Sequence, residues 1–190
     1  MMIVLKNKKE IFNPVILLGL GFFAVGGILS GILAAKYNTE AYEIIKEAAF
    51  FSDNFRETLI NGFLTGLLWT AMCIVGGMNV FLVPLIIVAV FVKGYSYGFT
   101  TGCIAASMGI YGYNIILAGL FIHNFLSILL LVFYGTFGIN KSIGCYLNRR
   151  NYEYIHRKNK VYIPASFAVI VLTLVISVVE AAVSLFLYEI

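Results

Sequence analysis

Long uninterrupted stretches of apolar residues dominate this chain, and their length limits what it can fold into. A helix rises ~1.5 Å per residue and the hydrocarbon core of a bilayer is ~30 Å thick, so about 20 apolar residues cross it. Hydrophobic residues make up 61% of the 190 residues and charged residues only 12%, which is more apolar surface than a soluble domain can bury. The pattern predicts an all-α, polytopic membrane helical bundle that forms a single domain over residues 1–190. Five transmembrane helices are expected at residues 14–35, 59–77, 80–102, 114–138 and 164–188, with a short turn at residues 76–79.

Basic residues are distributed unevenly around these spans. Nine of the 13 lysines and arginines precede the first span or lie in residues 139–163, whereas residues 36–58 carry five acidic and three basic side chains. The positive-inside rule therefore predicts a cytosolic N-terminus, a basic cytosolic loop at 139–163, an outer loop at 36–58 and a C-terminus outside. This orientation explains the net charge of +4 without nucleic-acid binding, for which no base-stacking platform is present.

The predicted outer loop contains an amphipathic pattern over residues 39–49. Thr39 is a suitable N-cap, and the apolar residues after it recur with helical spacing. Glutamates and a lysine occupy much of the other face. Two interpretations stay open: a helix that lies on the membrane or a partner, and a helix that folds back on its own bundle.

Glycines separated by three residues recur in the first three spans. Small residues at this spacing let two helix backbones approach closely inside a membrane. We expect these pairs to pack helices within the chain more than to form dimer faces, and nothing in the sequence specifies an oligomeric state. The expected packing glycines are Gly27, Gly31, Gly62, Gly66, Gly94, Gly98 and Gly102.

Four polar residues fall at membrane depth: Lys93, His123, Asn124 and Glu180. Ionisable groups in hydrocarbon are costly and usually face partners or cavities. Counting along the spans puts Lys93, His123 and Glu180 at similar depths. Because an opposite charge keeps a buried group ionised, we predict that Lys93 and Glu180 pair, with His123 as a hydrogen-bonding neighbour. Such a cluster either locks the helix arrangement, the preferred interpretation, or lines an ion path.

The sequence offers little for catalysis or for cofactor binding. The three cysteines lack the Cys-x-x-Cys spacing of metal sites. A glycine-rich string at residues 19–24 lacks the preceding strand that a dinucleotide site needs. Only two histidines are present, and the single aspartate, Asp53, falls in the outer loop, away from a buried nucleophile. We therefore predict a protein that is not an enzyme, with no catalytic residues, no cofactor and no metal.

Several short motifs follow one another in a recognisable order. A proline in an apolar run, a Lys-Gly break and a Gly-Phe-Thr-x-Gly string lie in the third span, a His-Asn pair begins at His123, and a Glu-Ala pair begins at Glu180. Together they resemble the stage II sporulation protein M family, in which a proline often stands where this chain has Ile122. The resemblance extends from the first span to the end of the chain. Its matching residues in the third span are Pro84, Lys93, Gly94, Gly98, Phe99, Thr100 and Gly102.

The resemblance implies a role in forespore engulfment in endospore-forming bacteria. Members of the family look like non-enzymatic, multi-pass anchors in the cell membrane. They localise two cell-wall hydrolases, the stage II sporulation proteins D and P, at the septum, and an outer loop and an outer C-terminus suit such partners. The alternative is a small transporter or permease subunit with Lys93, His123 and Glu180 lining its path. No internal repeat stands out, which counts mildly against a transporter.

Overall fold

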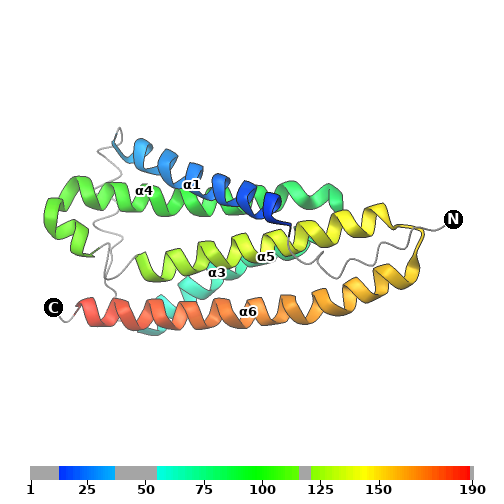
Figure 1. The fold of residues 1–190 in the computed structure, drawn as a ribbon. Helices are drawn as coiled ribbons and strands as arrows, with labels where there is room; N and C mark the ends of the chain where they lie inside the picture. The colour runs from blue at the N-terminus through cyan, green and yellow to red at the C-terminus, as the bar shows by residue number, and fades with distance from the viewer. Residues whose placement is uncertain (1–12, 37–54, 116–120, 189–190) are drawn as a thin grey trace.

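The computed structural model describes residues 13–36, 55–115 and 121–188. Within these ranges five long helices run back and forth (Figure 1), and each is long and apolar enough to cross a membrane. The chain is thus an all-α, multi-pass membrane protein, as predicted. The amphipathic pattern at 39–49 lies outside the described residues. The elements are α1 (Pro14–Lys36), α3 (Phe55–Gly76), the 3-10 turn η1 (Val80–Leu82), α4 (Val83–Ile115), α5 (Phe121–Leu147) and α6 (Tyr152–Tyr188).

The helix boundaries differ from the predicted spans on both sides of α5. The fourth span was predicted at 114–138, but α4 continues to Ile115 and α5 runs to Leu147. The predicted basic loop at 139–163 is therefore mostly helix, and residues 148–151 alone connect α5 to α6. Lysine and arginine are good helix formers, so a helix does not have to end where the hydrocarbon does.

The last helix begins well before its apolar run. Asn151 caps it, because its side-chain Oδ1 accepts a hydrogen bond from the backbone N–H of Tyr154 at 3.0 Å. Pro164, expected at the start of the fifth span, lies inside α6. A proline lacks the N–H that would bond to the preceding turn, yet the helix continues past it.

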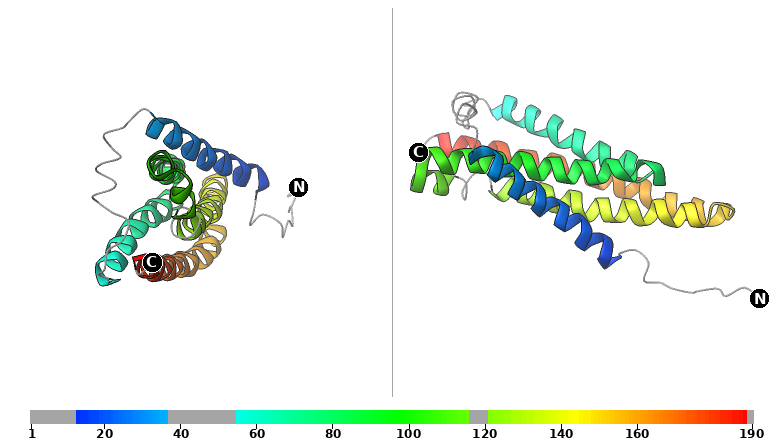
Figure 2. Two further views of the ribbon diagram at one scale, coloured as in Figure 1. Left: turned by 90° about the vertical axis from the view of Figure 1, so that its left-hand side faces the viewer. Right: turned by 90° about the horizontal axis from the view of Figure 1, so that it is seen from above.

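Four of the helices form a bundle, and α1 packs on its outside (Figure 2). Around the bundle, α3 contacts α4, α4 contacts α5, α5 contacts α6, and α6 contacts α3. Within the described residues α4 and α6 share no extended interface, so they occupy opposite corners. Helix α1 packs chiefly on α4 and also touches α5.

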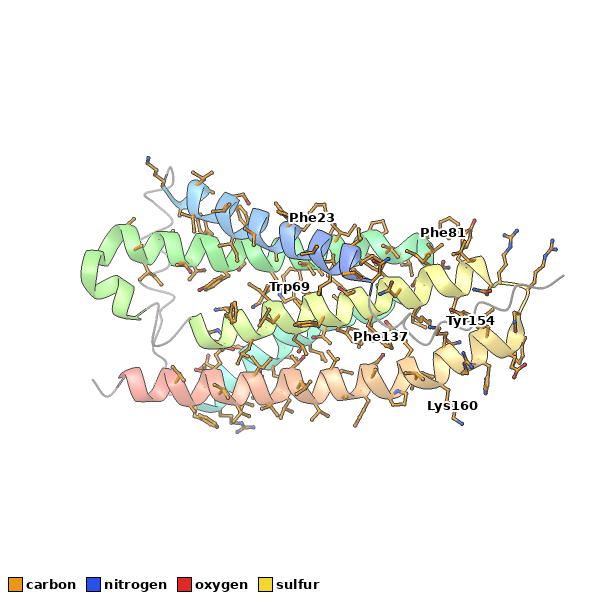
Figure 3. The ribbon with its side chains drawn as sticks, in the orientation of Figure 1. Phe23, Trp69, Phe81, Phe137, Tyr154 and Lys160 are labelled. Atoms are coloured by element: carbon orange, nitrogen blue, oxygen red, sulfur yellow. The ribbon has the colours of Figure 1, made fainter. Side chains whose placement is uncertain are left out.

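Helix α5 is the most enclosed element. In its most apolar stretch of 18 residues, 56% of the residues are buried, against 17–28% in the corresponding stretches of the other four helices. Its Leu131 and Val132 meet Ile86 and Val90 of α4 in one core. The other helices expose large apolar side chains on their outer faces, among them Phe23 (Figure 3). Such a surface fits hydrocarbon as its surroundings.

The turn predicted at residues 76–79 is confirmed. Helix α3 ends at Gly76, and the side chain of Asn79 accepts a hydrogen bond from the backbone N–H of Phe81 at 3.2 Å. This turn lies at the same end of the bundle as the α5–α6 connection (Figure 1).

Hydroxyl groups from α5 and α6 close the carboxyl end of α3. The last carbonyls of a helix have no partner in their own helix, and inside a membrane protein another group must supply one. Tyr162 donates its hydroxyl to the carbonyl of Ile74 at 2.8 Å, and Ser142 donates to the carbonyl of Gly77 at 2.7 Å. Three helices are joined in this way at one end of the bundle.

Candidate functional site: a polar seam inside the bundle

Polar side chains recur along one face of α6 and form what we call the α6 seam. Their spacing of three, four or seven residues places them on a single stripe of the helix. That stripe faces α3 and α5, the two helices that pack against α6. The α6 seam consists of Tyr162, Ser166, Thr173, Ser177 and Glu180.

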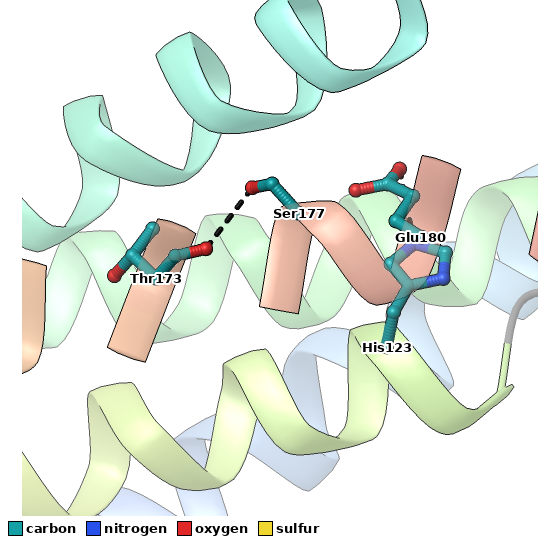
Figure 4. Close-up of polar contacts among 4 residues, drawn as sticks. All are labelled: His123, Thr173, Ser177 and Glu180. Atoms are coloured by element: carbon teal, nitrogen blue, oxygen red, sulfur yellow. Dashed lines mark hydrogen bonds and ion pairs between the residues drawn. The ribbon is translucent and has the colours of Figure 1, made fainter. Parts of the chain in front are cut away.

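The hydroxyl groups of the seam bond to their own helix and to the facing helices. Thr173 and Thr70 of α3 share a hydrogen bond of 3.0 Å between two buried hydroxyls. Ser177 donates to the carbonyl of Thr173 at 3.0 Å (Figure 4). Ser166 lies 2.5 Å from the hydroxyl of Tyr134 on α5. Hydrogen bonds of this kind hold transmembrane helices in one arrangement.

An ion pair stands at the far end of the seam. Oε1 of Glu180 lies 3.2 Å from Nε2 of His123 on α5, and the two side chains are 30% and 10% exposed (Figure 4). The other carboxylate oxygen faces α3, where a Cβ added to Gly62 would lie 2.7 Å from it. The absence of a side chain at Gly62 thus makes room for the carboxylate. The contact joins α5 to α6 through two polar side chains inside the bundle.

Two further polar residues were predicted at membrane depth. Asn124 follows His123 and is buried. Lys93 on α4 is half-buried. Among the ion pairs of the described residues, however, the partner of Glu180 is His123, and no Lys93–Glu180 pair forms within 4.0 Å. The corners that α4 and α6 occupy explain this, because the lysine would have to reach across the bundle.

The glycines of α1 and α4 bring these two backbones into direct contact. A Cβ added to Gly94 would lie 2.6 Å from the carbonyl oxygen of Ala24, and one on Gly31 would lie 2.5 Å from the backbone nitrogen of Phe99. Both contacts are with backbone atoms of the facing helix, so no side-chain rotation can relieve them. The other glycines of this contact, Gly27, Gly98 and Gly102, likewise face the partner helix within the same chain.

A second glycine contact joins α3 to the seam. A Cβ on Gly66 would lie 2.7 Å from Cγ2 of Thr173, one turn along from the place where Gly62 meets Glu180. Gly62, Gly66 and Thr70 therefore share one face of α3, which lies against the α6 seam. Small residues on α3 allow the polar groups of α6 to be buried.

The other end of the seam holds residues that sequence reasoning missed. Lys141 was expected in a cytosolic loop, but it lies on α5, is 6% exposed and places Nζ 4.6 Å from the ring centre of Tyr162. The Tyr162 ring also stacks on Phe137 and Tyr134. A cation over an aromatic face is a favourable contact when both are shielded from water. The signal that could have revealed this end is the spacing of polar residues from Tyr162 to Glu180.

These features lie within the part of the chain that a known family covers. The family model described as Stage II sporulation protein M matches residues 19–185. The chain belongs to the stage II sporulation protein M family. The resemblance expected from the motifs is thus confirmed, and membership makes the chain a sporulation-related, multi-pass membrane protein. Comparisons with curated proteins and with solved structures gave no significant match.

Proposed function

We propose that this protein is a non-enzymatic anchor in the cell membrane that recruits and localises peptidoglycan hydrolases at the septum during endospore engulfment. The observation that carries the proposal is the family match over residues 19–185. The proposed partners are membrane-anchored hydrolases that resemble the stage II sporulation proteins D and P. The anchor would hold these enzymes where the wall must be thinned.

The interior of the bundle supports a structural role. Its hydroxyl groups bond helix to helix, as in the Thr70–Thr173 and Tyr134–Ser166 contacts. The carboxyl end of α3 is closed by side chains from neighbouring helices, among them Tyr162 of α6. A protein that positions enzymes needs a rigid body, and these bonds supply one.

The proposed orientation places the basic end of the bundle in the cytosol. Arg149 and Arg150 lie in the α5–α6 connection and Arg157 lies near the start of α6, and the positive-inside rule assigns such an end to the cytosol. The opposite end, where α1 ends at Lys36 and α3 begins at Phe55, then faces the wall. Hydrolases that act on peptidoglycan would contact the protein on that side.

Affinity purification from sporulating cells tests the proposal. A tagged chain extracted in mild detergent should retain wall hydrolases, and a variant that lacks residues 39–50 should retain fewer while inserting normally. A matched control is deletion of residues 2–5, which precede the lysines on the cytosolic side and should leave retention unchanged. If the intact chain retains no hydrolase, the anchor role is wrong; if the 39–50 deletion retains them fully, the outer loop is not the contact.

A second candidate function is that of a small transporter or permease subunit. The observation that favours it is the contact between Glu180 and His123 inside the bundle. Ionisable residues within transmembrane segments commonly mark ion or proton paths. The same purification separates the two roles, because a transporter subunit would retain an ATPase subunit in place of wall hydrolases.

A further inference from the structure

A cavity opens at the basic end of the bundle, between the start of α1, the end of α5 and the start of α6. Its volume is about 390 Å³, within the range of ~300–1,000 Å³ that small-ligand sites usually have. The residues that form its wall include three asparagines, a tyrosine and Lys158, and none of them is acidic. The net charge of the described residues of the wall is therefore positive.

Lys158 supplies the positive charge of this wall. Lys158 places Nζ 5.5 Å from the ring centre of Tyr154 and, within the described residues, pairs with no carboxylate. An ammonium group that has no counter-ion favours an anion beside it. Helix α1 also begins here at Pro14, and the amino end of a helix favours negative charge.

The remaining wall of the cavity is apolar and leads to the membrane. Ile16, Ile143 and Leu147 lie beside the polar residues. Ile143 is 38% exposed and Leu147 is 75% exposed on the outside of the bundle. A ligand that fits this wall has an anionic, acceptor-rich head and a hydrocarbon tail.

We propose that this cavity binds the phosphate headgroup of an anionic glycerophospholipid, with its acyl chains along Ile143 and Leu147. Lys158 donates a hydrogen bond to a phosphate oxygen. Basic pockets between transmembrane helices at the cytosolic surface suit such headgroups, because that leaflet carries anionic lipids. This role goes beyond the anchoring of hydrolases and does not depend on it.

A glycine in α5 keeps the cavity open. A Cβ on Gly144 would lie 2.8 Å from the hydroxyl oxygen of Tyr154, which borders the cavity. Gly144→Val would therefore fill the site without changing its charge. Gly19→Val is the matched control, since a Cβ on Gly19 meets nothing within 4 Å.

Native mass spectrometry of the full chain in detergent tests the proposal. The protein is titrated separately with phosphatidylglycerol, with phosphatidylcholine and with glycerol 3-phosphate. Phosphatidylglycerol should bind at least about tenfold more tightly than phosphatidylcholine, the ratio expected from one charge-assisted hydrogen bond. Glycerol 3-phosphate, which shares the headgroup chemistry but has no acyl chain, should bind weakly. Equal binding of the two lipids, or equal binding of glycerol 3-phosphate and phosphatidylglycerol, would overturn the proposal.

Variants locate the site. Lys158→Gln should weaken phosphatidylglycerol binding about tenfold, whereas Lys160→Gln should not, because Lys160 is exposed and lies outside the cavity wall. Gly144→Val should abolish binding that Gly19→Val retains. If Gly144→Val does not fold, the lysine pair decides the matter, since both lysines reach the surface. Equal losses from the two lysine variants would show general charge attraction and refute the site.

Discussion

Replacing Gly31 with alanine should push α1 away from α4. The added Cβ would lie 2.5 Å from the backbone nitrogen of Phe99 and 3.0 Å from the carbonyl carbon of Gly98, whereas ordinary contacts begin at 3.4 Å. Because both atoms belong to the backbone of α4, the helices themselves must separate by roughly 1 Å. A gap of that size forfeits about a quarter to a half of the dispersion energy of the atoms beside it.

Two opposing effects set the size of the change. Overpacking a well-packed contact costs about 1–3 kcal/mol, while replacing a helical glycine with alanine gains about 0.5–1 kcal/mol. The net expectation for Gly31→Ala is a loss of up to about 2.5 kcal/mol. Gly19→Ala in the same helix meets nothing within 4 Å, so it should gain stability or leave it unchanged.

Thermal unfolding in detergent, followed by the reaction of a thiol dye with buried cysteines, can measure both changes. Cys73 and Cys103 are 0% and 2% exposed and react only on unfolding, and Cys145 is replaced with serine because it is half-buried. Gly31→Ala should lower the unfolding temperature and Gly19→Ala should not. If both variants shift it in the same direction by the same amount, close backbone contact does not hold α1 in place.

Three further outcomes are expected. Tyr162→Phe removes the hydroxyl that serves Ile74 and should cost about 1–2 kcal/mol in the same assay, whereas Tyr152→Phe, 79% exposed, should cost nothing measurable. Glu180→Leu or His123→Leu alone should destabilise by about 1–3 kcal/mol, and the double variant by less than the sum, because both single changes remove the same contact; additive losses would show that the pair is uncoupled. Single cysteines can be introduced into a cysteine-free chain in cells and tested with a membrane-impermeant thiol reagent. Cysteines at positions 78 and 150 should react only after permeabilisation, whereas a cysteine at position 57 should react from outside. The reverse pattern would invert the proposed orientation.

The helices were predictable from sequence because the bilayer imposes a length on each apolar run. The ends of the helices were less predictable, because hydropathy reports the solvent around a residue and not its backbone conformation. Residues 139–147 are polar enough to resemble a loop, yet they continue α5. Pro164 resembled a helix start but lies within α6.

The polar residues of the interior show a similar division. Counting along the spans gave the depth of Glu180 and His123, which meet in the structure. Counting could not give the corner of the bundle that each helix occupies. These corners determine which side chain contacts Glu180, and it is His123 and not Lys93. Tyr162 and Thr173 escaped notice because hydroxyls change hydropathy little, although each bonds to a neighbouring helix.

The packing of α1 on α4 has a consequence for how the protein is made. Gly31 leaves the ribosome about 67 residues before Gly98, its counterpart on α4. At roughly 5–20 residues per second, the glycine face of α1 waits about 3–13 s in the bilayer before its partner is synthesised. During that interval lipid or an insertion factor must occupy the face, so the pace of translation between the two helices becomes part of the folding pathway.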